Sequence, residues 1–426
     1  MNGDDAIRGI PRPPSPREKW LVVGLLWGVA LLNYLDRQML ATMKPAMMGD
    51  IRELQSAEAF GRLMAVFLWV YGLMSPIAGL IADRVNRKWL ITGSLAVWSG
   101  VTLAMGLAHD FQTLYLLRAV MGFSEALYIP AGLALIADYH QGGTRSLAVG
   151  IHMTGLYAGQ ALGGFGAAAA QHYSWQGTFQ AFGAAGVLYG VLLAVFLREH
   201  PTARGPRGSG GASSAAGGLA SVTQSLTLVL GTASYWVILA CFMAPSFPGW
   251  ATKNWLPTLF SESLGLDMPR AGPIATITIA ASSFVGVFIG GILADRWGQR
   301  HLRGRIYTSA MGLSLTVPAL LLMGLGGGPL AALGGAAAFG IGFGMFDANN
   351  MPILCQFVAP RHRAAAYGLM NMAGVFAGAQ VTNLLGRSTD AGHLGRDVAL
   401  LAVPVAVAVG LQLGVLRPRH ASKDHD

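Results

Sequence analysis

The chain of 426 residues is 53% hydrophobic and only 12% charged, with a mean hydropathy of +0.49. Soluble domains carry about twice this charged fraction, so the composition excludes an ordinary soluble protein. The net charge of +9 does not indicate a nucleic-acid partner, because the basic residues lie in short loops between apolar runs. We therefore expect an all-α membrane protein.

The apolar residues form runs of roughly 20, each long enough to cross the hydrocarbon core as a helix. We expect twelve such spans in two bundles of six. Their approximate boundaries are residues 20–43, 60–82, 89–108, 111–139, 147–170, 176–197, 234–260, 270–294, 305–325, 329–358, 364–386 and 397–416. The first 19 residues are rich in Pro and Arg and lack an apolar core, so we expect no cleavable signal peptide.

A linker is expected between the two bundles, because residues 198–233 begin with a stretch rich in Gly, Ser and Pro. Most Lys and Arg residues outside the spans lie on the side of this linker and of the two tails. The positive-inside rule then places the linker and both termini in the cytoplasm. The predicted domains are a tail (1–19), a bundle (20–197), the linker (198–233), a second bundle (234–416) and a tail (417–426).

The first span contains two adjacent charges, Asp36 and Arg37, inside the apolar stretch LLNYLDRQML. A charge at mid-membrane costs roughly 2.5–3.5 kcal/mol, so each needs a partner. Neighbours on a helix point about 100° apart and cannot pair well with each other. A structural ion pair and a role in transport both explain these residues, and we favour the second.

The fourth span contains Arg118 and Glu125, which are seven residues apart. Two helical turns place them on one face, about 10 Å apart along the axis. This separation is too long for a direct bond, so we expect a substrate or a residue of the first span between them.

The two halves of the chain repeat. GLIADRVNRK at 79–88 returns as GILADRWGQR at 291–300, and GFSEALYIP at 122–130 aligns more weakly with GMFDANNMP at 344–352. Two six-helix halves with matching loops indicate a parallel repeat about an axis along the membrane normal. Transporters with this architecture bind their substrate between the halves.

GLIADRVNRK resembles the loop motif of the major facilitator superfamily between its second and third helices, and this resemblance implies the major facilitator fold. NYLDR and RAVMGFSEA, with NWLPTLF and NNMPILCQ in the second half, resemble the anion:cation symporter family. That family includes bacterial galactonate and hexuronate transporters. Spinster-like lysolipid and sphingolipid transporters share a similar NYLDR and a helix-four GEA-type element, where this chain has Ser124 in place of Gly.

The resemblance also implies roles for the charged residues. Asp36 and Glu125 look like the protonation pair, and Arg37 and Arg118 look like anion-binding and gating cations. Desolvation favours the neutral form of a carboxyl group, whereas an adjacent Arg favours the ionised form. An anionic substrate that engages the Arg would therefore couple its own binding to that of a proton.

Other polar residues within the spans are candidate substrate ligands. An intramembrane polar residue is rarely without a partner, although packing tyrosines and amides that satisfy a carbonyl freed by Pro352 are alternatives. Lys253 either attracts anions or is a solvated helix end, and His152 is expected to be a satisfied polar residue. The candidate ligands are Tyr34, Tyr128, Gln160, Asp347, Asn349 and Asn350.

The repeated loop motif suggests a second group of residues that changes with conformation. By resemblance, these residues look like a charge latch that holds the halves in an outward-facing state. They are Asp83, Arg84, Arg87, Asp138, Arg145, Asp295 and Arg296.

These patterns predict a secondary active transporter, with proton-coupled symport of a small organic anion such as a sugar acid as the leading function. A Spinster-like lipid transporter and a metabolite or drug exporter are the alternatives; a receptor or scaffold would have little use for buried charges. We expect no enzyme activity, metal or cofactor, with the proton as coupling ion. We further expect a monomer in a bacterial inner membrane.

Overall fold

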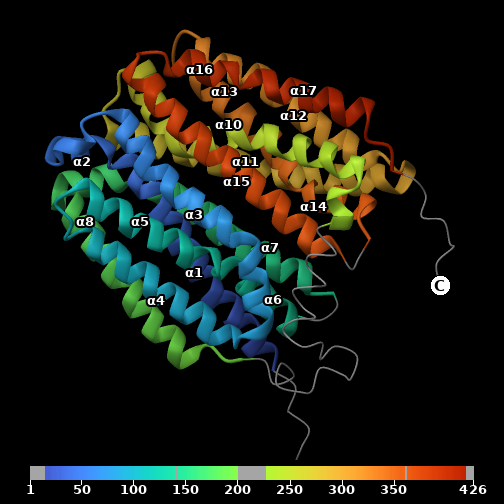
Figure 1. The fold of residues 1–426 in the computed structure, drawn as a ribbon, viewed down its shortest axis with the longest axis horizontal. Helices are drawn as coiled ribbons and strands as arrows, with labels where there is room; N and C mark the ends of the chain where they lie inside the picture. Colours follow the sequence, from blue (N-terminus) through green and yellow to red (C-terminus); the bar gives the residue numbers. More distant parts are fainter. Residues whose placement is uncertain (1–14, 141–142, 200–226, 360–361, 419–426) are drawn as a thin grey trace, which may run out of the picture.

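The computed structural model describes residues 15–140, 143–199, 227–359 and 362–418. Most of the predicted linker, as well as residues 1–14 and 419–426 of the predicted tails, lies outside the described residues. Every regular element within the described ranges is a helix. The elements form two bundles that lie side by side, one from each half of the chain (Figure 1).

The first bundle is built from long helices with conventional N-caps. Ser15, Ser56, Asn86 and Asp110 each accept a hydrogen bond from the backbone N–H three residues ahead, which satisfies a donor that the helix leaves free. The elements are α1 (Pro16–Thr42), α2 (Lys44–Asp50), η1 (Arg52–Leu54), α3 (Ala57–Arg84), α4 (Arg87–Met105), α5 (Phe111–Ala126), α6 (Tyr128–Tyr139), α7 (Arg145–Gly163) and α8 (Gly166–Phe196).

The second bundle repeats this order of long helices and short connections. Its elements are α10 (Ala233–Leu264), α11 (Met268–Arg300), α12 (Gly304–Leu325), α13 (Pro329–Asp347), α14 (Asn350–Phe357), α15 (Arg363–Asp390), α16 (Leu394–Leu400) and α17 (Ala402–Gly414).

Three of the predicted spans are each divided into two helices. The divisions α5/α6, α13/α14 and α16/α17 lie just before Pro130, Pro352 and Pro404. Proline has no N–H for the carbonyl four residues earlier, and its ring clashes with that carbonyl. The first two breaks fall at corresponding places of the weaker sequence repeat, so the repeat extends to the geometry of the helices.

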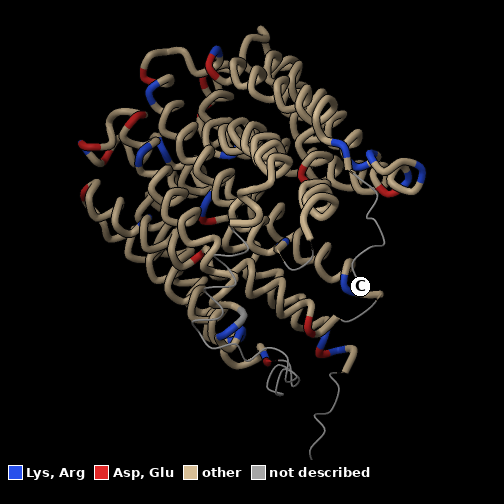
Figure 2. The backbone as a smooth tube through the Cα atoms, turned by 45° about the vertical axis from the view of Figure 1, so that its right-hand side comes forward, with Lys and Arg blue, Asp and Glu red and all other residues tan. Residues whose placement is uncertain are grey.

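Eight segments of the described chain are long and apolar enough to cross a membrane. The other four long helices, α4, α7, α10 and α15, do not meet both conditions. The eight are Pro16–Thr42, Ala57–Ala82, Phe111–Tyr139, Gly166–Phe196, Met268–Arg300, Gly304–Leu325, Pro329–Phe357 and Leu394–Gly414. Most charged residues lie at helix ends, and only a few lie inside the bundles (Figure 2).

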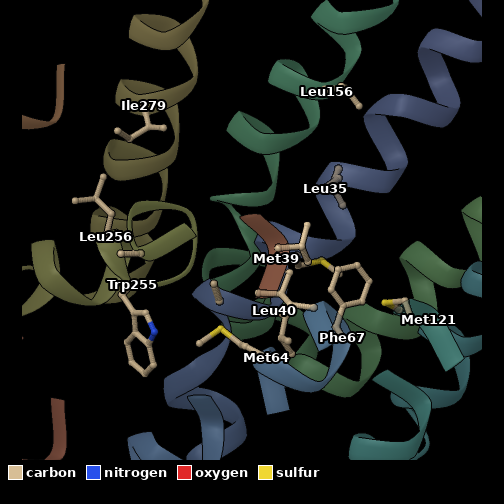
Figure 3. Packing of buried hydrophobic residues seen from close by; sticks show 14 of the residues in the cluster. Leu35, Met39, Leu40, Met64, Phe67, Met121, Leu156, Trp255, Leu256 and Ile279 are labelled. Carbon is tan, nitrogen blue, oxygen red and sulfur yellow. The ribbon is translucent and has the colours of Figure 1, made fainter. Parts of the chain in front are cut away.

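The halves contact each other mainly through two helix pairs. α3 packs against α15, and α7 packs against α11 (Figure 1). α3 and α11 carry the two copies of the repeated motif. Each copy therefore lies on a helix that packs against the opposite half. Trp255, Leu256 and Ile279 of the second half share one buried apolar cluster with Leu35 and Met39 of α1 (Figure 3).

Candidate functional site

Asp36 and Arg37 leave α1 in different directions and have different partners. Asp36 is buried and accepts a hydrogen bond at 3.1 Å from the Thr102 hydroxyl of α4. Arg37 points instead toward α5, where its Nε donates to Oε2 of Glu125 at 2.6 Å. The two neighbours therefore do not neutralise each other, as expected from their angular separation on the helix.

The ion pair of Arg37 and Glu125 is surrounded by aromatic rings. The Arg37 guanidinium carbon lies 5.1, 4.8 and 4.7 Å from the ring centroids of Tyr34, Phe67 and Tyr71. These distances are within the range of cation–π attraction. Glu125 is fully buried, and its Oε1 has no hydrogen-bond partner among the described residues. One carboxylate oxygen is therefore held by Arg37 while the other is available.

Arg118 is a second buried guanidinium that contacts Phe67. Its guanidinium carbon is 4.6 Å from the Phe67 ring centroid, and its Nη1 contacts the Met121 sulfur at 3.1 Å. Phe67 and Met121 are also neighbours in Figure 3. Phe67 thus contacts two buried guanidinium groups, and sequence reasoning missed it because a Phe in an apolar span carries no distinguishing signal. The residue of the first span that bonds Glu125 is Arg37.

A cavity of 70 Å³ lies between the two halves beside this charged cluster. Its polar lining comes from α1, α7, α10, α11 and α13, so both halves contribute. Tyr34 belongs to both features, because it lines the cavity and contacts Arg37. The other polar lining residues are Tyr157, Gln160, Thr252, Lys253, Ser283 and Asp347.

Lys253 provides the cavity with a positive charge from the second half. Its ammonium lies 4.8 Å from the Trp250 ring centroid and 5.9 Å from that of Tyr34. Asp347 lines the same cavity. The sequence suggested that Lys253 is near the end of its helix, but α10 continues to Leu264, about 16 Å farther at 1.5 Å per residue.

Three candidate ligands lie away from this cavity. Tyr128 is fully buried in the first half, where its hydroxyl donates to the Leu26 carbonyl at 2.8 Å. Asn349 donates to the Met345 carbonyl at 2.8 Å, and so satisfies a backbone acceptor at the α13/α14 break. Asn350 donates to Oδ1 of Asp347 at 3.2 Å, which makes it a support for a cavity residue.

The candidate latch residues lie at helix ends remote from the cavity. Arg87 pairs with Asp138 inside the first half, and Asp295 pairs with Arg305 at 2.9 Å inside the second. Both pairs therefore link helices of one half. Arg84, Arg145 and Arg296 are exposed, and the side chain of Asp83 lies outside the described residues.

The opposite ends of the helices carry a contact between halves that sequence reasoning did not find. Asp390, the last residue of α15, accepts hydrogen bonds at 2.8 Å from the backbone N–H groups of Ala57 and Glu58. Arg387 pairs with Glu58 at 3.0 Å. Because Ser56 caps Ala59 at the same place, α15 completes the N-terminal cap of α3 across the interface.

Lys44 strengthens the closure at this end. It is buried, and its ammonium lies 4.8 Å from the Trp255 ring centroid of the other half. Burial lowers the pKa of Lys44 to about 8, while Glu262 and Asp390 act in the opposite direction. The halves are therefore joined by charged as well as apolar contacts at the end that carries α2.

The comparison with protein families agrees with this geometry. Residues 26–380 match the family described as Major Facilitator Superfamily. The chain belongs to this superfamily. Membership confirms the resemblance carried by the repeated loop motif, and identifies the chain as a multi-pass membrane transporter with the all-helical major facilitator fold.

The relatives of this major facilitator protein fall into the two groups that the sequence motifs suggested. Protein spinster homolog 1 of Homo sapiens is 31% identical over 193 residues, which are 44% of this chain and 36% of the relative. Protein spinster homolog 3 of Danio rerio is 28% identical over 330 residues, which are 72% and 64%. The match thus spans less than two thirds of either Spinster protein.

The galacturonate transporter of Dickeya chrysanthemi is 25% identical over 323 residues, which are 72% of this chain and 90% of the relative. Among solved structures, a bacterial homolog of the human lysosomal transporter Spinster is similar in its inward-facing occupied and unoccupied forms, with TM-scores of 0.76 and 0.77. The identities are 19% and 20%, with 94% of this chain and 97% of each structure covered. This likeness shows the shared major facilitator fold.

Proposed function

We propose that this protein is a secondary active transporter that carries a small organic anion, of the sugar-acid type, together with a proton. The observation that carries this proposal is the buried pair of Arg37 and Glu125 beside a polar cavity that both halves line. A charged pair at membrane depth is costly, and such pairs commonly belong to proton or substrate pathways.

The pair gives a simple coupling mechanism. While Arg37 holds Glu125, the carboxylate form is stabilised. An anion in the cavity would attract the Arg37 guanidinium, through contact near Tyr34, and weaken its bond to Glu125. The buried carboxylate would then bind a proton, because an unpaired charge in a dry site is costly. Asp36, bound to Thr102, is proposed as the second member of the protonation pair.

The cavity supports an anionic and hydroxylated substrate. Lys253 offers a cation to an anion in the cavity, beside Asp347, and Gln160, Tyr34 and Tyr157 offer groups that bind hydroxyls. Asp347 would disfavour a substrate with a second negative charge nearby. A galacturonate transporter among the relatives supports the same substrate class.

The topology of the membrane domain belongs to the same proposal. We propose twelve spans with the described α4, α7, α10 and α15 included, cytoplasmic termini, and the domain boundaries predicted above. α7 and α10 line the cavity, and this role explains why these two helices contain polar residues. In this topology the contacts of Asp390 and Lys44 lie on the outer side. A monomer in a bacterial inner membrane, without cofactor, completes the proposal.

The first test replaces Glu125 by Gln in protein reconstituted into liposomes. We expect exchange of galacturonate across the membrane to persist, because binding needs no proton on this residue. Proton-driven accumulation should disappear. The measurement combines uptake of labelled galacturonate with a pH-sensitive dye inside the liposomes.

Glu53→Gln is the matched control, since Glu53 is an exposed carboxyl group in η1, outside the site. It should accumulate substrate like the unmodified protein. Uphill accumulation by Glu125→Gln would contradict the assignment of the proton to this residue.

A Spinster-like lipid transporter is the second candidate, because two Spinster proteins are among the relatives. The same liposomes discriminate the two. Lysolipid movement between leaflets without any response to sugar acids or monocarboxylates would select this candidate. An anion-dependent change of internal pH would select symport.

A further inference from the structure

A groove of 550 Å³ lies on the second half, away from the cavity between the halves. It is formed where α11 ends, α12 begins and α17 ends. The main packing partners of α12 and α17 are other helices of the second half, so this face is not part of the interface between halves. In a membrane, such an outer helix face meets lipid.

The mouth of the groove is basic and aromatic. Arg300 and His301 are exposed at the end of α11, and Trp297 and Tyr307 flank them. Tryptophan and tyrosine are enriched at membrane–water interfaces, where their rings are apolar and their N–H or O–H groups reach water. The mouth therefore has the composition of a site at the depth of the lipid headgroups in a membrane.

The floor of the groove is apolar and open. Met311 and Leu413 line it and are 41% and 43% exposed, and Ala310 lies between them. Contact with a hydrocarbon chain would remove this apolar surface from water, which is favourable. A basic mouth above an apolar floor is complementary to one end of a phospholipid.

Within the part of the chain that the structure describes, few acidic residues lie near the groove. Asp295 is the single acidic residue in the described stretch from 291 to 325, and it is paired with Arg305 at 2.9 Å. The α17 end contributes no acidic residue between 402 and 418. Among the described residues, Arg300 therefore lines the groove without an ion-pair partner.

Arg303 fixes the shape of the groove. Its Nη2 donates to the Leu413 carbonyl, and its guanidinium carbon lies 5.1 Å from the Tyr307 ring centroid. This contact ties the start of α12 to the end of α17. The Arg303 Nε is buried and has no hydrogen-bond partner among the described residues.

We propose that this groove binds an anionic phospholipid, with the phosphate at Arg300 and His301 and an acyl chain along Met311 and Leu413. Basic pockets between membrane helices bind anionic headgroups in this way. The site is separate from the proposed transport cavity, so the lipid is a bound partner of the second half rather than the cargo.

The test is a titration of the purified full-length protein in detergent with phosphatidylglycerol, followed by native mass spectrometry. Phosphatidylglycerol should bind at least ten-fold more tightly than phosphatidylcholine. Arg300→Gln should weaken phosphatidylglycerol binding about five-fold, the effect of one basic residue at a membrane surface. Arg198→Gln, which removes an exposed cation of the first half, is the matched control and should leave binding unchanged.

A phosphatidylglycerol with a photoreactive acyl chain locates the site independently of affinity. We expect labelling of peptides that contain Met311 or Leu413. Inorganic phosphate that displaces the lipid at equal concentration would overturn the proposal in favour of a free-anion site. Equal binding of both lipids, equal loss in Arg300→Gln and Arg198→Gln, or labelling confined to other helices would also overturn it.

Discussion

Lys253 shows how the environment of one side chain changes its interpretation. Near the end of a helix it would be a solvated cation, whereas within α10 it faces a cavity shared with Tyr34 and Asp347. Arg37 and Arg118 are instead held in the first half, against Glu125 and Phe67. Lys253 is therefore the cation that an anion in the cavity reaches without first breaking an ion pair with Glu125.

Replacing Lys253 by Gln should raise the KM for the transported anion by about ten-fold or more, since a hydrogen bond to a charged group contributes about 1.5–3 kcal/mol. Uptake of galacturonate into liposomes over a range of concentrations measures this effect. Lys253→Arg should recover part of the affinity because it keeps the charge. An unchanged KM in Lys253→Gln would remove this residue from the binding site.

Helices α1 and α7 pack closely through a row of small residues. Gly155, Gly159 and Gly163 of α7 face the backbone of α1, and a Cβ at Gly155 would lie 2.6 Å from the Trp27 carbonyl oxygen. These residues belong to the Gly-rich string GLYAGQALGGFG, which lies inside a helix and packs as small residues do in membranes. The close approach positions α1, and with it Arg37, against α7 and its cavity residues.

Gly159→Ala should destabilise the first bundle by about 1–3 kcal/mol, because the added Cβ would overlap the Leu31 carbonyl. A lower Tm of the purified protein in detergent measures it. Gly150→Ala on the same helix is the control, since a Cβ there meets nothing within 4 Å. Its Tm should be equal or higher, given the better helix propensity of Ala. Equal Tm values for the two variants would refute the packing argument.

At the scale of the whole molecule, polar contacts join the two halves. Asp390 and Arg387 of α15 hold the start of α3, and a carboxylate at a helix N-terminus is favoured by the helix dipole. The hydrogen bonds between Gln38 and the Lys253 carbonyl, and between Thr276 and the Ala161 carbonyl, connect the same halves. If the proposed transporter works by alternating access, the Asp390 contact has to open when the cavity changes sides.

Asp390→Ala should shift the population toward states that are open at this end, because two N–H groups of α3 lose their acceptor. Spin labels at exposed positions Glu53 and Ala391, in protein without Cys241 and Cys355, report the separation of the halves by electron–electron resonance. The ratio of open to closed states should rise about two- to thirty-fold, corresponding to a cap worth roughly 0.5–2 kcal/mol.

Asp267→Ala is the control for this measurement. Asp267 pairs with Arg270 of the same half at 3.7 Å, at the same end of the molecule. It should leave the distance distribution unchanged. A distribution that is identical in Asp390→Ala and the unmodified protein would show that the contact does not hold the halves together.

Sequence patterns alone determined the class of fold, because long apolar runs in a membrane must form helices that satisfy their own backbone. The repeated loop motif likewise identified the two halves and the superfamily. The local breaks before Pro130, Pro352 and Pro404 follow from proline chemistry, although they were not predicted. The predicted spans at 147–170 and 234–260 correspond to α7 and α10, which are less apolar than the eight segments named above because they line a polar site and contain polar residues.

Only the tertiary structure decided which charges meet. The order of residues indicated that Asp36 and Arg37 need separate partners, but the choice of Thr102 and Glu125 depends on how α1 rotates against α4 and α5. The cavity position of Lys253 and the cap of α3 by Asp390 join residues more than 200 positions from their partners in the chain. Sequence spacing fixes neighbours along one helix, whereas contacts across the interface depend on packing between helices.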